Sequence, residues 1–435
     1  MLERIAIIGS GISGLTAAYR LHPRYQITVF EANDYVGGHT NTVDVELEGE
    51  RHSIDTGFVV FNDWTYPNFI RMLGELSVEW QPTTMSFSVR DDRSDLEYNG
   101  ESFGSLFAQS RNFFRPVFYR MLADIWRFNS RAIRDTSHCG DEVTVGEFLA
   151  KHRYSRAFAD QYLLPMGAAI WSCPIGTFAQ FPIRFIVEFY RNHGLLSVTH
   201  WPTWRVISGG SRNYVAEITR GFRDRIRLDT PILRVIRRPD RVDVHPADRD
   251  LESFDHVIFA CHSDQALRIL GDNATRTERG ILSEFPYGRN TAVLHTDISV
   301  FPHRRRAWAS WNYRIHDGAE STAATITYNM NLLQGIRSQN TFCVTLNDES
   351  RIAPGKILRR FDYEHPIFTT RRSVAQSRHA ELMNANRSSF CGAYWGNGFH
   401  EDGVNSALSV VNTINASHQV PRTGISTQCR AGVAR

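Results

Sequence analysis

The chain is poor in lysine, in closely spaced cysteines and in long apolar runs. Only two of its 49 basic residues are lysines, Lys151 and Lys356, so a mechanism that needs a lysine has two candidates. None of its six cysteines forms a CxxC pair, which excludes a zinc-ribbon site or a disulfide framework, and we expect no metal. No apolar run approaches about eighteen residues, and the first strand pattern begins at Ile5, so we expect neither a membrane-spanning helix nor a signal peptide.

The overall composition is that of an ordinary globular protein. The 435 residues are 42% hydrophobic and 22% charged, which allows two or three domains with sizeable cores. The net charge of +3 is too small to indicate nucleic acid as a partner. Free thiols fit a reducing compartment, so we expect the protein in the cytoplasm.

A strand, a glycine turn, a helix and a second strand open the chain. An apolar run at 5–8 is followed by Gly9-Ser10-Gly11-Ile12-Ser13-Gly14, a helical pattern at 15–21 and a strand pattern at 26–31. Gly9 permits the tight turn, Gly11 lets backbone N–H groups approach a pyrophosphate, and Gly14 lets helix and strand pack closely. Glu31, followed by Ala32, ends the second strand and can accept hydrogen bonds from an adenosine ribose. This order predicts a dinucleotide site.

Two later segments carry a family resemblance. Gly37-Gly38 follow the strand-ending acid, and an Asp-x-Gly segment follows at 53–58. Together they resemble the start of flavin-containing amine oxidases, protoporphyrinogen oxidases and phytoene desaturases. Those families usually carry arginine after the Gly-Gly pair. This chain has His39 and then Thr40, so we expect a weaker and pH-sensitive phosphate contact.

The resemblance reaches the end of the chain. The glycine-rich stretch 390–407 resembles the closing flavin motif of the same superfamily, in which N–H groups at a helix start face the flavin N1/O2 edge. We expect that helix to begin near Gly403. The resemblance implies FAD, held non-covalently because Cys391 belongs to the preceding strand. It adds these residues to the cofactor site: Thr56, Gly57, Phe58, Val235, Ala260, Gly392, Glu401, Asp402, Gly403 and Val404.

The predicted fold class is α/β (α+β), a Rossmann-like FAD/NAD(P)-binding domain with an inserted substrate domain of helices and mixed sheet. The FAD-binding domain is predicted at 1–75, 201–275 and, as the closing motif, 381–418. Helices of the substrate domain are predicted at 76–200 and its sheet at 276–380, with strands at 291–295, 307–313 and 323–328. A loose tail is predicted at 419–435.

Arginines alternate with aromatic residues at helical spacing between 111 and 128. One interpretation is an amphipathic helix packed on its own core. The other is a face that lines a lipid entrance or rests on a membrane surface, which would place the protein at the periphery of the inner membrane. The sequence also allows two interpretations for each of two further segments. The apolar stretch 163–172 shapes a substrate pocket or is a buried helix end, and His365 belongs to a structural loop or to the pocket rim.

Three residues of the closing motif are candidates for catalysis: His400, Glu401 and Tyr394. His400 is either a general base or a histidine that hydrogen-bonds to the flavin or the backbone. The chain has no lysine between 289 and 299, where oxidases of the superfamily often hold a water near flavin N5. That departure weakens an assignment as an amine oxidase.

The predicted activity is removal of a hydride from a carbon of a hydrophobic substrate. Asn62, Tyr66 and the stretch 363–366 resemble a bacterial branch that is often encoded beside cyclopropane-fatty-acid synthases, which suggests a fatty-acyl or phospholipid chain. A flavin amine oxidase and a non-catalytic flavoprotein, acting as a sensor or an assembly partner, remain as alternatives. The sequence leaves the oligomeric state and the electron acceptor open.

Overall fold

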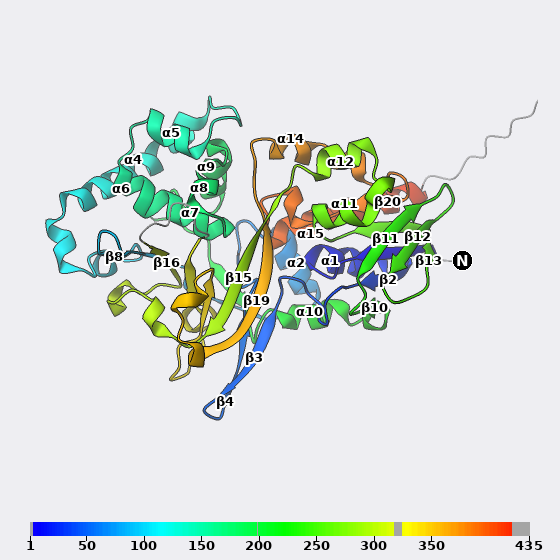
Figure 1. The fold of residues 1–435 in the computed structure, drawn as a ribbon, viewed down its shortest axis with the longest axis horizontal. Coiled ribbons are helices and arrows are strands. Elements are labelled where there is room, and N and C mark those ends of the chain that lie inside the picture. The colour runs from blue at the N-terminus through cyan, green and yellow to red at the C-terminus, as the bar shows by residue number, and fades with distance from the viewer. Residues whose placement is uncertain (1–2, 198, 317–323, 420–435) are drawn as a thin grey trace, which may run out of the picture.

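A computed structural model describes residues 3–197, 199–316 and 324–419 (Figure 1). Its dinucleotide-binding part is built on a parallel sheet in the order β10-β2-β1-β14-β20. The strands are β1 (Arg4–Ile8), β2 (Gln26–Phe30), β10 (Ile226–Arg227), β14 (His256–Phe259) and β20 (Ser388–Phe390). They come from three widely separated stretches of the chain. The predicted tail lies outside the described residues from 420 onward.

Helices cover this sheet because its central strands are apolar on both faces. Helix α1 (Ile12–Leu21) follows β1 and packs against the long C-terminal helix α15 (His400–Gln419) and against α10 (Arg212–Thr219). An antiparallel sheet of β11 (Ile232–Arg237), β12 (Val242–Pro246) and β13 (Glu252–Phe254) lies next to it, with α11 (Ser263–Leu270) packed on β11. Helix α12 (Arg276–Leu282) packs on α11 and on α14 (Arg372–Ser377).

A seven-stranded mixed sheet, in the order β19-β15-β18-β17-β16-β7-β8, forms the second part of the molecule. Its longest pair, β15 (Tyr287–His295) and β19 (Ile357–Pro366), runs through the middle of the molecule between the two parts (Figure 1). The other strands are β7 (Phe87–Asp91), β8 (Leu96–Asn99), β16 (Trp311–Ile315), β17 (Ile326–Asn329) and β18 (Cys343–Leu346), with α13 (Met330–Gln334) after β17.

Smaller strands and one helix join the two parts. The hairpin of β3 (Thr42–Leu47) and β4 (Glu50–Asp55) projects from the body of the molecule (Figure 1). Strands β5 (Val60–Asn62), β9 (Trp204–Ile207) and β6 (Trp80–Pro82) form a three-stranded sheet, and α2 (Pro67–Glu75) connects β5 to β6.

Helices at the end far from the dinucleotide sheet complete the fold (Figure 1). They are α3 (Phe103–Leu106), α4 (Pro116–Thr136), α5 (Val145–Lys151), α6 (Arg156–Phe158), α7 (Leu164–Trp171), α8 (Ile175–Phe178) and α9 (Ile183–Asn192). Helix α4 begins at a proline, which has no N–H to leave unpaired. Helix α5 is capped reciprocally by Thr144 and Glu147.

Two predicted boundaries are wrong. The strand predicted from 307 begins at Trp311, because Arg305–Ala307 form a 3₁₀ turn and the Trp308 indole donates to Pro302 O over 2.8 Å. The C-terminal helix begins at His400 and not near Gly403. The Asp402 carboxylate accepts the Phe399 N–H over 2.9 Å, and this hydrogen bond stabilises a helix that starts at His400.

Candidate functional site

One cavity of about 1220 Å³ is lined by both parts of the molecule. It takes residues from the glycine turn after β1, from α15 and from the seven-stranded sheet. Pockets for a single small ligand usually measure about 300–1,000 Å³. This volume is therefore large enough for a dinucleotide cofactor and a substrate beside it.

The glycine turn shows which glycines are needed for packing and which for a ligand. Gly9 has φ +105°, and a Cβ there would lie 2.8 Å from Ala260 O. A Cβ on Gly14 would lie 2.0 Å from Gly9 O, so helix and turn are in direct contact. A Cβ on Gly11 would meet no protein atom within 4 Å, and Gly11 lines the cavity. Protein atoms therefore fill the space beside Gly9 and Gly14, whereas the space beside Gly11 is free for a ligand.

Glu31 is fixed over this turn. Its Oε2 accepts the Ser10 N–H at 2.9 Å and the Ser10 hydroxyl at 2.5 Å, and its Oε1 accepts the Asn33 N–H at 3.0 Å and the Asn33 side-chain amide at 2.9 Å. A carboxylate has about four acceptor positions, and these bonds occupy them. A ribose hydroxyl would therefore bind Glu31 by replacing Ser10 Oγ or Asn33 Nδ2.

His39 lies among aromatic rings. Its ring centre is 5.1 Å from that of Tyr363, 5.2 Å from that of His365 and 6.2 Å from that of His262. Its Nε2 is buried with no hydrogen-bond partner among the described residues, and the side chain lines the cavity. Burial, followed by the neighbouring imidazoles, holds the pKa of His39 well below its usual range. A neutral imidazole can still donate one N–H, and the pH-sensitive phosphate contact of His39 stays a prediction.

His400 lies at the start of α15 against Phe58, with ring centres 3.5 Å apart and planes at 14°. Its Nε2 is 3.0 Å from Thr40 Oγ1 and 3.2 Å from the Tyr214 hydroxyl. Burial lowers the pKa of His400 to about 3. An imidazole with so low a pKa is a weak proton acceptor at neutral pH, so this geometry favours the hydrogen-bonded role over the general base.

Glu401 and Asp402 point to backbone N–H groups. The Glu401 carboxylate accepts the N–H of Asn68 at 3.0 Å and of Phe69 at 2.8 Å, which caps the first turn of α2. The Asp402 carboxylate caps α15 itself, and burial raises its pKa to about 6. Neither lines the cavity. The first backbone N–H groups of α15 have no partner inside the helix, and they follow Phe399, which does line the cavity.

Two other predicted residues lie in different settings. Tyr394 lines the cavity from the 3₁₀ turn Ala393–Trp395, and a Cβ on Gly392 would lie 2.3 Å from its ring. Val235 does not line the cavity: its side chain is fully buried in the core between β11 and the parallel sheet. The register of β11 shifts between Ile232 and Arg234, and this irregularity leaves Leu233 on the cavity wall.

Most of the predicted cofactor residues meet in one place. Those that line the cavity are Gly9, Ser10, Gly11, Ile12, Ser13, Glu31, Ala32, Gly37, Gly38, His39, Thr56, Gly57, Phe58, Ala260 and Gly392. Those that do not are Gly14, Thr40, Val235, Glu401, Asp402, Gly403 and Val404, which support the site from behind. A Cβ on Gly403, for example, would lie 2.7 Å from the Ile12 side chain, so α15 packs closely on the first turn of α1.

The rest of the wall is largely apolar. Met166, Ile170, Trp171 and Ser172 line it, while most of α7 is buried, so the stretch 163–172 is a buried helix whose end reaches the cavity. His365 lies in strand β19 and lines the cavity, so it belongs to the wall and not to a loop. The sequence did not single out Phe189, His193 or Tyr287. These side chains come from separate elements, and helical or strand periodicity alone gives no sign of a shared cavity.

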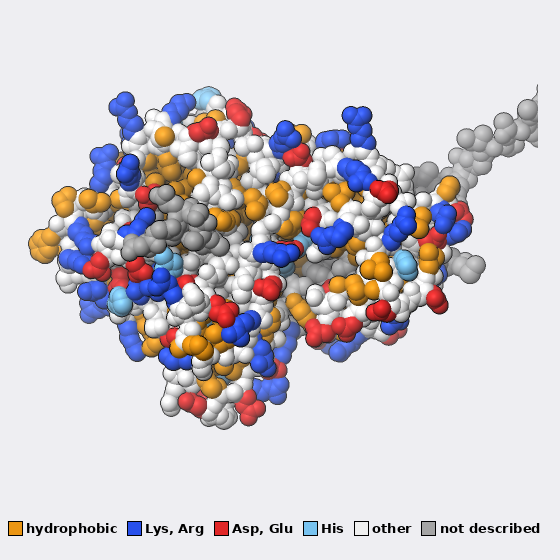
Figure 2. Space-filling model, viewed as in Figure 1, with side chains coloured by type: hydrophobic (Ala, Val, Ile, Leu, Met, Phe, Trp, Pro, Cys, Tyr) orange, Lys and Arg blue, Asp and Glu red, His pale blue; other side chains and the backbone are white. Residues whose placement is uncertain are grey.

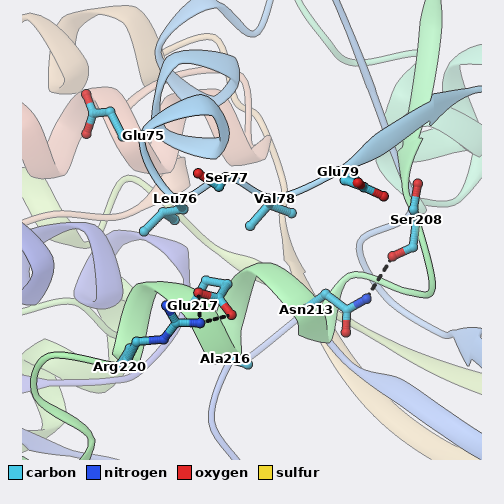
Figure 3. Close-up of a pocket in the computed structure, with 10 residues that line it drawn as sticks. All are labelled: Glu75, Leu76, Ser77, Val78, Glu79, Ser208, Asn213, Ala216, Glu217 and Arg220. Carbon is cyan, nitrogen blue, oxygen red and sulfur yellow. Dashed lines mark hydrogen bonds and ion pairs between the residues drawn. The ribbon is translucent and has the colours of Figure 1, made fainter.

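A second, polar depression of about 580 Å³ lies between the end of α2 and α10 (Figure 3). Asn213 donates to Ser208 O over 2.7 Å, and Arg220 pairs with Glu217, so much of its polar lining is already paired (Figure 3). It shares no residue with the larger cavity. We therefore assign the functional site to the larger cavity.

The described ranges 3–197, 199–316 and 324–419 also bear on metals and membranes. No group of three or more His, Cys, Asp or Glu side chains there is placed to hold a metal ion. Within the same ranges, no helix combines the length and the apolar character needed to cross a bilayer.

The residues present fit a dinucleotide that carries a redox ring. The open Gly11, the buried Nε2 of His39 with no partner and the start of α15 converge on one cavity. The fold and the site thus define a flavoprotein of the two-part, Rossmann-containing class. The model of the family described as "Flavin containing amine oxidoreductase" matches residues 12–298, and the chain belongs to this family. The cofactor is FAD, which supplies hydride acceptance at its ring.

This chain also resembles individual proteins in sequence or in fold. A segment of 76 residues is 45% identical to a 1-hydroxycarotenoid 3,4-desaturase of Flavobacterium sp., but it covers only 17% of this chain and 14% of that protein. The structure of cyclohexylamine oxidase from Brevibacterium oxydans IH-35A superposes with a TM-score of 0.68 at 16% identity, covering 97% of this chain and 100% of that one. A CLA-producing fatty acid isomerase from P. acnes superposes with a TM-score of 0.66 at 14% identity, covering 94% and 98%. The two superpositions show the shared fold.

Proposed function

We propose that this protein is an FAD-dependent oxidoreductase that removes a hydride from a carbon of a hydrophobic substrate, a fatty-acyl or phospholipid chain. The observation that carries the proposal is the chemistry of the cavity wall beyond the cofactor residues. The wall residues between 85 and 204 and between 311 and 344 include no Asp, Glu, Lys or Arg. The charged side chains of the same cavity lie outside these two stretches: Glu31, Asp55, Arg268, Arg289, Asp362 and Glu364. A protonated amine seated against the two stretches would have no charge partner, whereas an acyl chain needs none.

The wall has the side chains that an alkyl chain prefers. Its apolar members are Met85, Phe87, Met166, Ile170, Trp171, Phe189, Leu195, Trp204, Trp311, Tyr328, Met330, Leu333 and Val344. Each CH₂ group moved from water into such surroundings is stabilised by about 0.8 kcal/mol. Methionine is flexible and polarizable, so its presence suits a chain whose position varies.

The relatives and structural neighbours include proteins named for apolar substrates and one named for an amine. One relative is named a carotenoid desaturase and one structural neighbour a fatty acid isomerase. Another neighbour is a cyclohexylamine oxidase. The fold therefore accommodates both substrate classes, and the wall chemistry is the feature that favours the lipid.

The test is flavin bleaching without oxygen. Purified FAD-loaded protein is mixed with phospholipid vesicles, with free fatty acids or with a panel of amines, and the flavin absorbance is followed. We expect bleaching with a lipid and none with an amine, and mass spectrometry should find a lipid product two mass units lighter. A flavin that stays oxidised with every lipid rejects the proposal.

A flavin amine oxidase is the second candidate. The rings of Phe189 and Phe399 lie 5.3 Å apart at 27°, with Trp171 6.4 Å from Phe399, which gives one end of the cavity an aromatic character. This function predicts hydrogen peroxide release with a polyamine or an aromatic amine in air. A non-catalytic flavoprotein, in contrast, would bind FAD and show no turnover with any donor.

A further inference from the structure

Large hydrophobic side chains are exposed in one stretch of the helical end. Seven of the fourteen that are exposed in the described part of the chain lie between 103 and 133. They are Phe103, Phe113, Phe114, Val117, Tyr119, Trp126 and Ile133, and we call this set the aromatic face. Phe114 is 87% exposed, and Phe103 and Trp126 are each 70% exposed. A soluble protein rarely leaves so many rings in water without a use for them.

The residues of the aromatic face are exposed although α4 also has a well-packed side. The opposite side of α4 is well packed, with Phe118, Met121 and Phe128 buried. Tyr119, Trp126 and Ile133 recur every seven residues, so they share the outer side of the helix. Phe103 and Phe113 are held by Phe107, whose ring lies 4.1 Å from that of Phe113. The face is therefore ordered by local contacts while it remains uncovered.

Arginines lie along the segment that carries the aromatic face, and two of them are paired with carboxylates: Arg111 with Asp95 and Arg134 with Asp135. Residues 110–137 contain six arginines and two aspartates, a net charge of +4 in a chain whose total is +3. Asp124 is buried and is shared between Arg120 at 3.5 Å and Arg127 at 3.1 Å, so it offers no negative charge to the surface. Figure 2 shows hydrophobic side chains and Lys or Arg side chains gathered at the end of the molecule where Figure 1 places α4.

We infer that the aromatic face docks on the surface of an anionic phospholipid bilayer. Aromatic and large aliphatic side chains beside arginines are the composition of interfacial helices, in which rings enter the headgroup region and arginines meet lipid phosphates. The charge complementarity favours anionic lipid over a neutral surface. The inference rests on exposed side chains and charge, and it holds whether or not the substrate is a lipid.

Docking through the aromatic face would bring a bilayer close to the cavity. Helix α4 packs on α9, which carries the cavity residue Phe189, and its buried side joins the core of the seven-stranded sheet. A bilayer on the outer side of α4 would therefore lie against the helical part of the molecule, one layer from the apolar wall. The dinucleotide-binding sheet would remain on the side facing water (Figure 1).

The test is co-sedimentation of the FAD-loaded full chain with vesicles of phosphatidylcholine alone or with phosphatidylglycerol added. We expect binding that needs the anionic lipid and weakens as salt is raised, because salt screens surface charge. Phe114→Ser with Trp126→Ser should abolish binding, and Arg115→Gln with Arg131→Gln should weaken it by about fivefold per arginine. These side chains lie at the surface, so an unchanged flavin spectrum verifies that each variant is folded.

Matched controls come from exposed residues elsewhere. Trp201→Ser with Leu251→Ser removes an equal number of exposed hydrophobic side chains, and Arg249→Gln with Arg359→Gln removes the same charge. Both should bind vesicles like the unaltered protein. Equal loss in these controls, or no binding of the unaltered protein to anionic vesicles, overturns the inference. An oligomer that the Phe114 and Trp126 variant dissociates would also overturn it, because it would assign the face to a second copy of the chain.

Discussion

At the scale of single residues, the glycines of the first turn divide by what surrounds them. A methyl group on Gly14 would collide with Gly9 O, whereas one on Gly11 would enter the cavity. We predict that Gly14→Ala destabilises the protein by about 1–3 kcal/mol, as overpacking does. Gly11→Ala should leave stability without cofactor unchanged and lower FAD binding. Urea unfolding of the FAD-free protein and flavin absorbance per chain measure the two effects, and equal stability of the two variants contradicts this assignment.

The buried imidazole of His400 makes stability depend on pH. Its pKa falls to about 3 in the folded protein, so below about pH 6.5 the unfolded chain takes up a proton that the folded chain refuses. Its contribution is full above that pH and falls by about 1.4 kcal/mol per pH unit below it. We predict that His400→Gln flattens the decline in stability between pH 6.5 and 5, measured by urea unfolding.

A matched variant separates this effect from others. His245→Gln makes the same replacement at an exposed histidine on β12 and is the control. Asp55 and Asp402 act in the opposite direction, since burial raises the pKa of each to about 6. The comparison with the unaltered protein removes their contribution. A profile for His400→Gln that parallels the original would show that this imidazole is not held neutral.

At the scale of elements, Glu401 joins the start of α15 to the start of α2. Its carboxylate accepts two backbone N–H groups there and does not reach the cavity. We predict that Glu401→Ala lowers stability by about 1–2 kcal/mol, as the loss of a helix cap does, while substrate-induced flavin bleaching per bound FAD is retained. Stopped-flow absorbance and urea unfolding separate the two. Loss of bleaching with stability intact would restore Glu401 as a catalytic residue.

The sequence predicted those parts of the fold and site that depend on local order. The opening strand, turn and helix are local, and the fold class and FAD were both inferred and are confirmed. The surroundings of His39 were not predicted, because Tyr363 and His365 approach it from more than 300 residues further along the chain. Leu233 was missed for another reason: the family resemblance indicated Val235, and the register shift of β11 between Ile232 and Arg234 leaves Leu233 on the cavity wall.

At the scale of the whole molecule, the cavity wall sets what fits beside the cofactor. Ile170 lines it and is only partly buried. We predict that Ile170→Trp shortens the longest acyl chain that bleaches the flavin, since added volume removes room for methylene groups. Val374→Trp, on an exposed residue of α14, is the control. A chain-length series followed by flavin absorbance makes the comparison, and an unchanged length limit would place the acyl chain elsewhere.

The parallel sheet has a consequence for how the protein is made. Its strands come from residues 4–30, 226–259 and 388–390, and Gly403 packs directly on Ile12. A ribosome releases the first strand long before the last, so the opening strand and helix must wait for their partners. We predict that nascent chains stalled before residue 388 acquire no flavin fluorescence signature, whereas chains extended past residue 419 do. FAD would then act at the end of synthesis, by selecting chains whose two ends have met.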